Sequence, residues 1–115
     1  MATTYKKGES AQRKWGSWQV LLVENDFVVK SLRILPGEKT SLQSHSHRSE
    51  CLVVAAGAGV VTRGEEKISV ATNDMVFLPV ECKHRVENTG DSELIIIETQ
   101  TGDLLDENDI IRYDG

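Results

Sequence analysis

Short runs of strand-favouring residues, each ended by a turn, are the feature that most limits the fold of this 115-residue chain. From Trp15 onward they cover 18–23, 27–35, 41–47, 50–56, 59–62, 67–71, 75–80, 84–87 and 94–99. Turn-forming residues separate many of these runs, at 36–37, 63–65, 72–74 and 88–91. Gly, Pro, Asn and Asp favour the backbone angles of turns. The alternation predicts an all-β fold.

Segment 103–110 is the only stretch with a helical pattern, and we expect a short C-terminal helical turn there. It is too short to cover a parallel sheet, which excludes an architecture of alternating strands and helices. Nine short strands with tight connections predict a β-sandwich or a small closed barrel, since closure removes the edges of an antiparallel sheet. Residues 1–14 are polar, so we expect a flexible N-terminal arm followed by one domain over 15–115.

The composition excludes several classes of protein. With 13 Lys and Arg against 18 Asp and Glu, the net charge is −5, and no extended basic run suggests nucleic-acid binding. The apolar runs are far shorter than the roughly 20 residues that cross a bilayer, and no apolar signal segment opens the chain. Two cysteines are too few for a disulfide framework. We therefore expect a cytoplasmic protein with no membrane partner.

Several predicted strands are apolar on both faces, notably 50–56 and 94–97. A sheet with one face in water should instead alternate apolar and polar residues. Something must therefore cover the second face: the region of Trp15 and Trp18, the C-terminal segment with Ile110 and Tyr113, or a second copy of the chain. We expect a homodimer, because two-fold dimers are the commonest closed assemblies.

All three histidines lie in or beside predicted strands, two of them within 43–50. Alternate residues of a strand share a face, so Gln43, His45 and His47 are expected to project the same way. Glu50 returns on the next strand, and His84 follows a turn that reaches across the sheet. Imidazole and carboxylate groups are ligands for Zn, Mn, Fe, Co and Ni. The cluster predicts a divalent metal site, with zinc as the first choice.

The residues around this cluster resemble the two motifs of the cupin family. The first motif is matched by Gly37, Gln43, His45, Glu50 and Gly57, and the second by Pro79, His84 and Asn88. Asn73 and Glu81 stand where the family pattern has glycine. The resemblance implies a single double-stranded β-helix, the jelly-roll barrel of cupins.

The same resemblance implies that Gln43, His45, Glu50 and His84 hold the metal. Gln43 occupies a position where most cupins have His. The alternative is that His47 is the ligand and Gln43 lies behind it, because imidazole generally outcompetes a carboxamide for such a metal.

Over about residues 13–114, the chain resembles the C-terminal domain of type II mannose-6-phosphate isomerases. The match includes 15–17, 41–43, 47–48, 60–64, 83–88 and 109–112. It implies a metal-dependent enzyme of carbohydrate metabolism that interconverts mannose 6-phosphate and fructose 6-phosphate by moving a proton between C1 and C2. Ser44, Ser46, Ser49, Cys51 and Leu52 replace residues that are common in that family around the ligands.

Three further residues are assigned to the expected reaction. His47 would carry the proton, since an imidazole titrates near neutrality. Arg48 would grip the phosphate of a sugar-phosphate ligand, because a guanidinium binds two oxygens at once; a surface turn arginine is the alternative. Lys30 is expected to face inward, with the substrate phosphate or Glu98 as its partner.

Two other functions stay open. One is a cupin of another activity, such as a metal-dependent oxygenase or a lyase, because one fold hosts many reactions. The other is a non-catalytic module that binds a sugar or a metal, which the small size and the replacements around the site suggest.

Overall fold

The computed structural model describes residues 2–114, which form thirteen β-strands and no helix. The strands are β1 Ala2–Thr3, β2 Ser10–Arg13, β3 Gly16–Val23, β4 Phe27–Ile34, β5 Gln43–Ser44, β6 Arg48–Ala56, β7 Ala58–Arg63, β8 Glu66–Ala71, β9 Met75–Leu78, β10 His84–Asn88, β11 Leu94–Gly102, β12 Leu104–Leu105 and β13 Ile111–Arg112. The all-β prediction is confirmed. Within the described range, no helix could cross a membrane.

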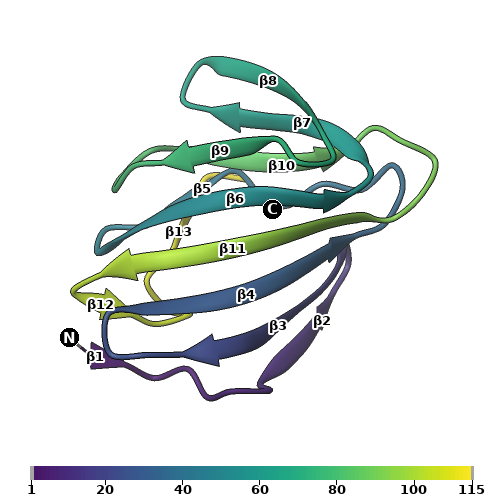
Figure 1. Cartoon of the computed structure of the whole chain (residues 1–115). Helices are drawn as coiled ribbons and strands as arrows, with labels where there is room; N and C mark the ends of the chain where they lie inside the picture. The colour runs from purple at the N-terminus through teal and green to yellow at the C-terminus, as the bar shows by residue number, and fades with distance from the viewer. Residues whose placement is uncertain (1, 115) are drawn as a thin grey trace.

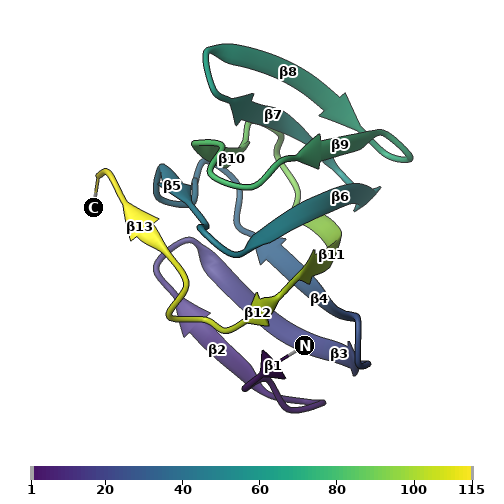
Figure 2. The same cartoon turned by 90° about the vertical axis from the view of Figure 1, so that its left-hand side faces the viewer.

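Two large sheets face each other, as Figures 1 and 2 show. The six-stranded sheet has the order β2-β3-β4-β11-β6-β9, and the five-stranded sheet has the order β13-β5-β10-β7-β8. The strands in these two sheets pair antiparallel, and β1 and β12 form a separate parallel pair. The chain crosses between the sheets after β4, β5, β6, β8, β9 and β10. These crossings give the predicted β-sandwich.

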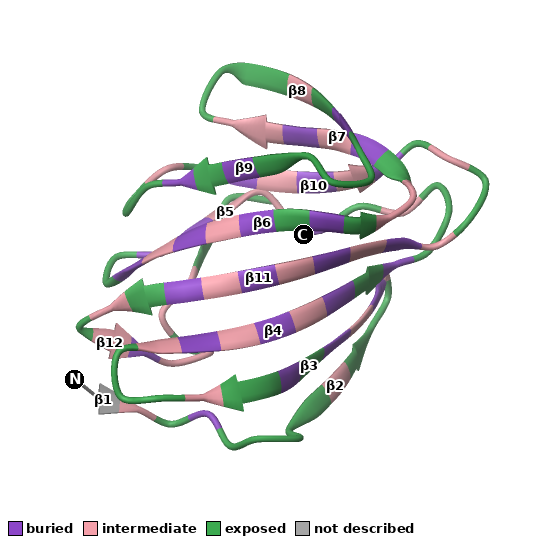
Figure 3. Cartoon of the chain, viewed as in Figure 1, coloured by how far each residue is buried: buried purple, intermediate pink, exposed green. Residues whose placement is uncertain are grey.

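The inward-facing rows of the six-stranded sheet change character along their length. Burial alternates along β4, β6 and β11 with the period of two expected for strands (Figure 3). Toward one end the buried residues are apolar, among them Ile34, Leu94 and Ile96. Toward the other end they are Lys30, Arg48, Glu50, Glu98 and Gln100. The sandwich therefore has an apolar core at one end and a buried polar group at the other.

The expected helical turn at 103–110 is wrong. Residues 104–105 form β12, which pairs with β1. Side-chain carboxylates bind backbone N–H groups here: Asp106 accepts from the backbone of Asn108, and Asp109 accepts from Ser46 and His47. Such bonds compete with helix formation and favour turns.

The segment expected to be a flexible arm is built into the sheets. β2 pairs with β3 over four residues, from Ser10–Gln19 to Arg13–Gly16. Tyr5 is buried in the core, with its ring centroid 6.3 Å from that of Trp18 in an edge-on arrangement. The sequence signal, a run of polar residues, reflects an edge strand whose side chains face water.

The outer face of the six-stranded sheet is apolar and exposed around β6 and β9. Val53 lies opposite Met75 in the register of these strands, and Phe77 lies opposite Cys51. Val53, Met75 and Phe77 are all exposed, whereas Trp18 packs into the core. Within residues 2–114, neither terminal segment covers this patch, and the homodimer stays a prediction.

The turn between β9 and β10 contains a backbone conformation that is unusual for its residue. Glu81 has a φ of 69°, in the left-handed region; Asn73, in the preceding turn between β8 and β9, has a φ of 78°. The backbone N–H of Glu81 donates to the carbonyl of His45 at 2.8 Å. The turn that delivers β10 is thereby tied to the segment after β5.

Replacing Glu81 tests the strain in this turn. A side chain with a Cβ in the left-handed region costs roughly 1–2 kcal/mol that glycine avoids. We expect Glu81→Gly to be more stable than Glu81→Ala by about 1 kcal/mol, measured as the free energy of unfolding in urea. Equal stability of the two variants would show that the turn is not strained.

Candidate metal centre

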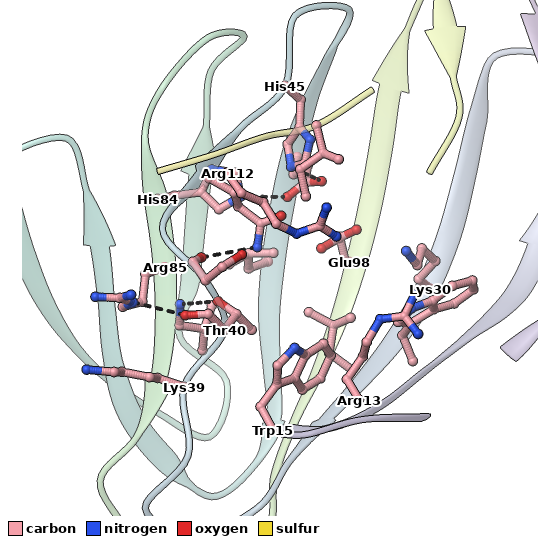
Figure 4. A pocket seen from close by; sticks show the side chains of 18 of the residues that line it. Arg13, Trp15, Lys30, Lys39, Thr40, His45, His84, Arg85, Glu98 and Arg112 are labelled. Carbon is pink, nitrogen blue, oxygen red and sulfur yellow. Dashed lines mark hydrogen bonds and ion pairs between the residues drawn. The ribbon is translucent and has the colours of Figure 1, made fainter. Parts of the chain in front are cut away.

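Three predicted ligands meet at the polar end of the sandwich. Glu50 lies on β6, His45 follows β5, and His84 begins β10. Figure 4 shows the two histidines at the cavity. All three are buried, and each offers a ligand atom within 4.8 Å of the other two. His45 Nε2 lies 3.3 Å from Glu50 Oε2, and His84 Nε2 lies 3.5 Å from Glu50 Oε1. This group could hold a metal ion.

The other ring nitrogen of each histidine faces a backbone carbonyl. His45 Nδ1 lies 2.7 Å from the carbonyl oxygen of Asp109, and His84 Nδ1 lies 3.1 Å from that of Cys82. A carbonyl only accepts, so in each neutral ring Nδ1 carries the proton and Nε2 keeps its lone pair. Both lone pairs then lie against the Glu50 carboxylate. Arg48 Nη2, 3.4 Å from His45 Nε2, can donate to one of them, and a metal ion among the three groups would accept both. Metal-binding histidines are oriented in this way.

Electrostatics favours the metal-binding protonation states of Glu50 and His45. Burial alone would raise the pKa of Glu50, but the Arg48 guanidinium, whose Nε lies 2.9 Å from Oε2, and the nearby histidines lower it to about 2. Burial lowers the pKa of His45, more than the Glu50 charge raises it. An ionised carboxylate and a neutral imidazole are the forms that bind metal.

Gln43 lies at the edge of the group. It is half-buried on β5, directly opposite His84 in the pairing with β10. Its side-chain amide nitrogen donates to the Ser41 carbonyl at 3.3 Å. Its assignment as a fourth ligand stays a prediction.

His47 is not part of the group. Strand β5 ends at Ser44, and the backbone N–H groups of Ser46 and His47 bind the Asp109 carboxylate, which turns the chain outward. His47 is 49% exposed, and its Nδ1 lies 3.3 Å from Asp103 Oδ1. The expectation that His47 shares a face with Gln43 and His45 is wrong, because strand alternation stops before it. The structure therefore supports neither the proton-carrier role nor the alternative ligand role.

Arg48 and Lys30 are buried and already paired, so Arg48 is not a surface turn residue. Arg48 donates to Glu50 and, at 2.9 Å, to the carbonyl of Asp106. Lys30 faces inward as predicted, but its ion-pair partner is Glu107, at 3.1 Å, and not Glu98. The Lys30 ammonium also lies 4.1 Å from the centre of the Trp18 ring.

Glu98 is a further buried carboxyl beside the cluster. Burial first, and then the charge of Glu50, raise the pKa of Glu98 to about 7. Gln100 donates to it at 2.6 Å. The alternation of β11 could have revealed both, since they continue the inward row of Leu94 and Ile96.

Two other site residues lie outside the predicted strands, although Asp109 belongs to the segment 109–112 that matches the family. Glu107 and Asp109 lie in the irregular segment between β12 and β13, yet Glu107 binds Lys30 and Tyr5, and the backbone of Asp109 orients His45. Their roles depend on where a turn folds back over the sandwich, which local pattern does not specify.

A cavity of about 490 Å³ opens onto the cluster. Gln43, His45, Glu50 and His84 line it, as do Lys30, Arg48 and Glu98. Trp15, Leu32 and Leu52 contribute apolar wall. A cavity of this size with a few convergent polar groups suits a small-molecule ligand.

Comparison with known proteins identifies the family. The family model described as "Mannose-6-phosphate isomerase C-terminal" matches residues 2–115. The chain belongs to this family. Mannose-1-phosphate guanylyltransferase RfbM of Salmonella typhimurium is 37% identical over 110 residues, which are 96% of this chain and 23% of that protein. Xanthan biosynthesis protein XanB of Xanthomonas campestris is 37% identical over 113 residues, 98% of this chain and 24% of XanB. The chain thus spans about a quarter of the curated relatives' length.

Solved structures agree on the fold. A capsular polysaccharide assembling protein, CapF, of Staphylococcus aureus superposes with a TM-score of 0.78 at 22% identity, over 93% of this chain and 34% of that one. A cupin-2 domain from Rhodospirillum rubrum gives a TM-score of 0.73 at 21% identity, over 88% of this chain and 77% of that one. The chain is a jelly-roll cupin, as the motifs implied.

These comparisons correct the expected activity. The resemblance implied interconversion of mannose 6-phosphate and fructose 6-phosphate, but the curated relatives are named for guanylyl transfer and for xanthan or alginate biosynthesis. Although the family description contains the word isomerase, the relatives do not support isomerase activity. Several of the relatives carry the name mannose-1-phosphate guanylyltransferase.

Glu98 predicts a pH dependence of stability. Its folded pKa lies above its unfolded value, so between about pH 5 and 7 the folded state holds a proton that the unfolded state has lost, and stability falls as the pH rises. We expect the free energy of unfolding of Glu98→Gln, relative to that of the wild type, to rise by at least about 1 kcal/mol from pH 5 to pH 8. Urea unfolding with chelator present measures this difference. The exposed Glu65→Gln is the control. If the difference in unfolding free energy between Glu98→Gln and the wild type does not change with pH, Glu98 does not hold a proton in the folded state.

Proposed function

We propose that this chain is a divalent-metal-binding cupin domain whose cavity binds a phosphorylated mannose beside the ion. The observation that carries the metal is the pair of Nε2 lone pairs, on His45 and His84, that lie against the ionised Glu50. The names of the relatives support the ligand class, since mannose 1-phosphate is the substrate in RfbM's name.

The donor set favours zinc. Two imidazoles and one carboxylate are typical zinc ligands, and such a set leaves a position for a further oxygen. The Gln43 amide oxygen is our candidate for a fourth ligand from the chain, because Gln43 lines the cavity opposite His84. Manganese, cobalt, nickel and iron accept the same groups.

A bound ion would polarise an oxygen of the ligand, and the residues of this chain set the surroundings. Arg48 keeps Glu50 ionised and holds it through its Nε. Glu98, buried beside Glu50, can hold or release a proton near neutral pH. The apolar wall near Trp15 and Leu32 limits water around the ligand.

The domain would work alongside mannose-1-phosphate guanylyl transfer. The relatives named for that activity are about four times as long as the part that matches this chain. We propose that this chain supplies the metal-dependent ligand site in that chemistry, and that the nucleotidyl transfer belongs to another part or another protein.

Metal titration tests the proposal. We expect the chelator-stripped wild type to bind about one zinc ion per chain in calorimetry, and His45→Ala, His84→Ala and Glu50→Gln each to lose at least about tenfold in affinity, because each removes a ligand. His47→Ala is the matched control, since His47 lies next to the cluster in sequence but outside the cavity.

The control also gives the outcome that would contradict the site. Retention of zinc by His45→Ala together with its loss in His47→Ala would overturn the ligand set. Circular dichroism of each variant separates loss of a ligand from loss of the fold.

A further inference from the structure

The two cations that were expected to bind phosphate inside the cavity are already neutralised. Arg48 Nε lies 2.9 Å from Glu50 Oε2, and Lys30 Nζ lies 3.1 Å from Glu107 Oε1. Arg48 and Lys30 are each only 4% exposed. A phosphate dianion at this depth would have to disrupt buried ion pairs, which leaves uncompensated charge in a region of low dielectric. The phosphate of a ligand therefore needs another place.

The rim of the same cavity carries cations that face water. Arg13, Lys14, Lys39 and Arg112 line the cavity and are exposed. Within residues 2–114, none of these four forms an ion pair with a carboxylate.

The other charged groups of the rim do not cancel this charge. Arg85 is half-buried, donates to the Thr40 carbonyl and pairs with Asp114. Asp114 also accepts from the backbone of Leu42. Glu38 is the remaining rim carboxylate. The rim is thus positive on a chain whose net charge is −5, and such a local field concentrates anionic ligands.

Two of the rim arginines come from opposite sheets. Arg13 ends β2 of the six-stranded sheet, and Arg112 ends β13 of the five-stranded sheet. Figure 4 shows both side chains at the cavity, with Trp15 beside Arg13. Arg13 donates only to the adjacent Gln12 carbonyl, at 3.0 Å, among the described residues, and its guanidinium lies 5.9 Å from the Trp18 ring centre. Most of its donors are therefore available to a ligand.

We infer that Arg13 and Arg112, assisted by Lys14 and Lys39, form a phosphate site at the rim of the cavity. This inference rests on the proposed function and adds an orientation to it: the phosphate lies at the rim and the sugar hydroxyls point inward to the metal cluster. Guanidinium groups suit this task because each can donate two parallel hydrogen bonds to phosphate oxygens.

Calorimetry with mannose 1-phosphate, mannose and inorganic phosphate tests the rim site, on zinc-loaded and on chelator-stripped protein. We expect Arg13→Gln and Arg112→Gln each to weaken mannose 1-phosphate binding about tenfold, the loss that corresponds to one charge-assisted hydrogen bond. Zinc affinity should not change. Arg112→Lys should lose less affinity for mannose 1-phosphate than Arg112→Gln, because lysine keeps the positive charge but not the two parallel donors of the guanidinium.

Lys67→Gln is the matched control for net charge, because Lys67 is exposed on β8 and does not line the cavity. We expect it to bind mannose 1-phosphate like the wild type. A loss equal to that of the arginine variants would overturn the local site in favour of a general charge effect.

Inorganic phosphate separates the rim from the metal. We expect inorganic phosphate to bind the stripped wild type. It should bind the stripped double variant Arg13→Gln/Arg112→Gln about a hundredfold more weakly, because two tenfold losses multiply. If mannose 1-phosphate binds the zinc-loaded double variant as tightly as the wild type, the rim site is wrong and the proposed function stands. If the wild type binds no zinc, the proposed function fails. The phosphate titration of the stripped protein still shows whether the rim arginines bind phosphate.

Discussion

The buried ion pair between Arg48 and Glu50 is the interaction on which the polar end of this sandwich depends. The guanidinium keeps the pKa of Glu50 low despite complete burial, and its Nη1 donates to the Asp106 carbonyl and the Tyr5 hydroxyl. One side chain therefore joins β6, the segment after β12 and the N-terminal segment. Removing one partner of such a pair leaves an uncompensated buried charge, which typically costs 3–5 kcal/mol. The ligand cluster and the closure of this end of the sandwich are thus stabilised together.

Local pattern predicted the strands because they follow from the two-residue period, whereas the resemblance to the cupin motifs supplied the ligand set. Strand alternation places Lys30 inward, and the spacing from His45 to Glu50 spans the crossing from β5 in one sheet to β6 in the other. The same rule failed at His47, where Asp109 binds the backbone and ends the strand at Ser44. It failed again at 103–110, where side-chain oxygens compete for backbone N–H groups. In both places a contact distant in sequence, or one outside the regular pattern, determines the conformation.

The charges of the chain are sorted by depth, and composition alone cannot show this. A net charge of −5 gave no indication of an anion-binding role. In the folded chain, the acidic groups inside the cavity are paired or, for Glu98, shifted toward the neutral form. The cations of the rim come from segments near both ends of the chain, Arg13 and Arg112, which the sheet order brings to one opening. Charge distribution, and not total charge, therefore indicates the class of ligand.

The hydrogen bond from the Glu81 backbone to the His45 carbonyl fixes the spacing of the two imidazoles through the main chain. Backbone pairing and the core, which lie outside the ligand cluster, hold the ligands near one another. Small domains that fold only on binding zinc form their ligand geometry together with the ion, whereas here the geometry is preorganised. At the proposed metal site, exchange of one divalent ion for another would then require little rearrangement of the protein. Which ion the proposed site holds would be decided chiefly by which ions are available.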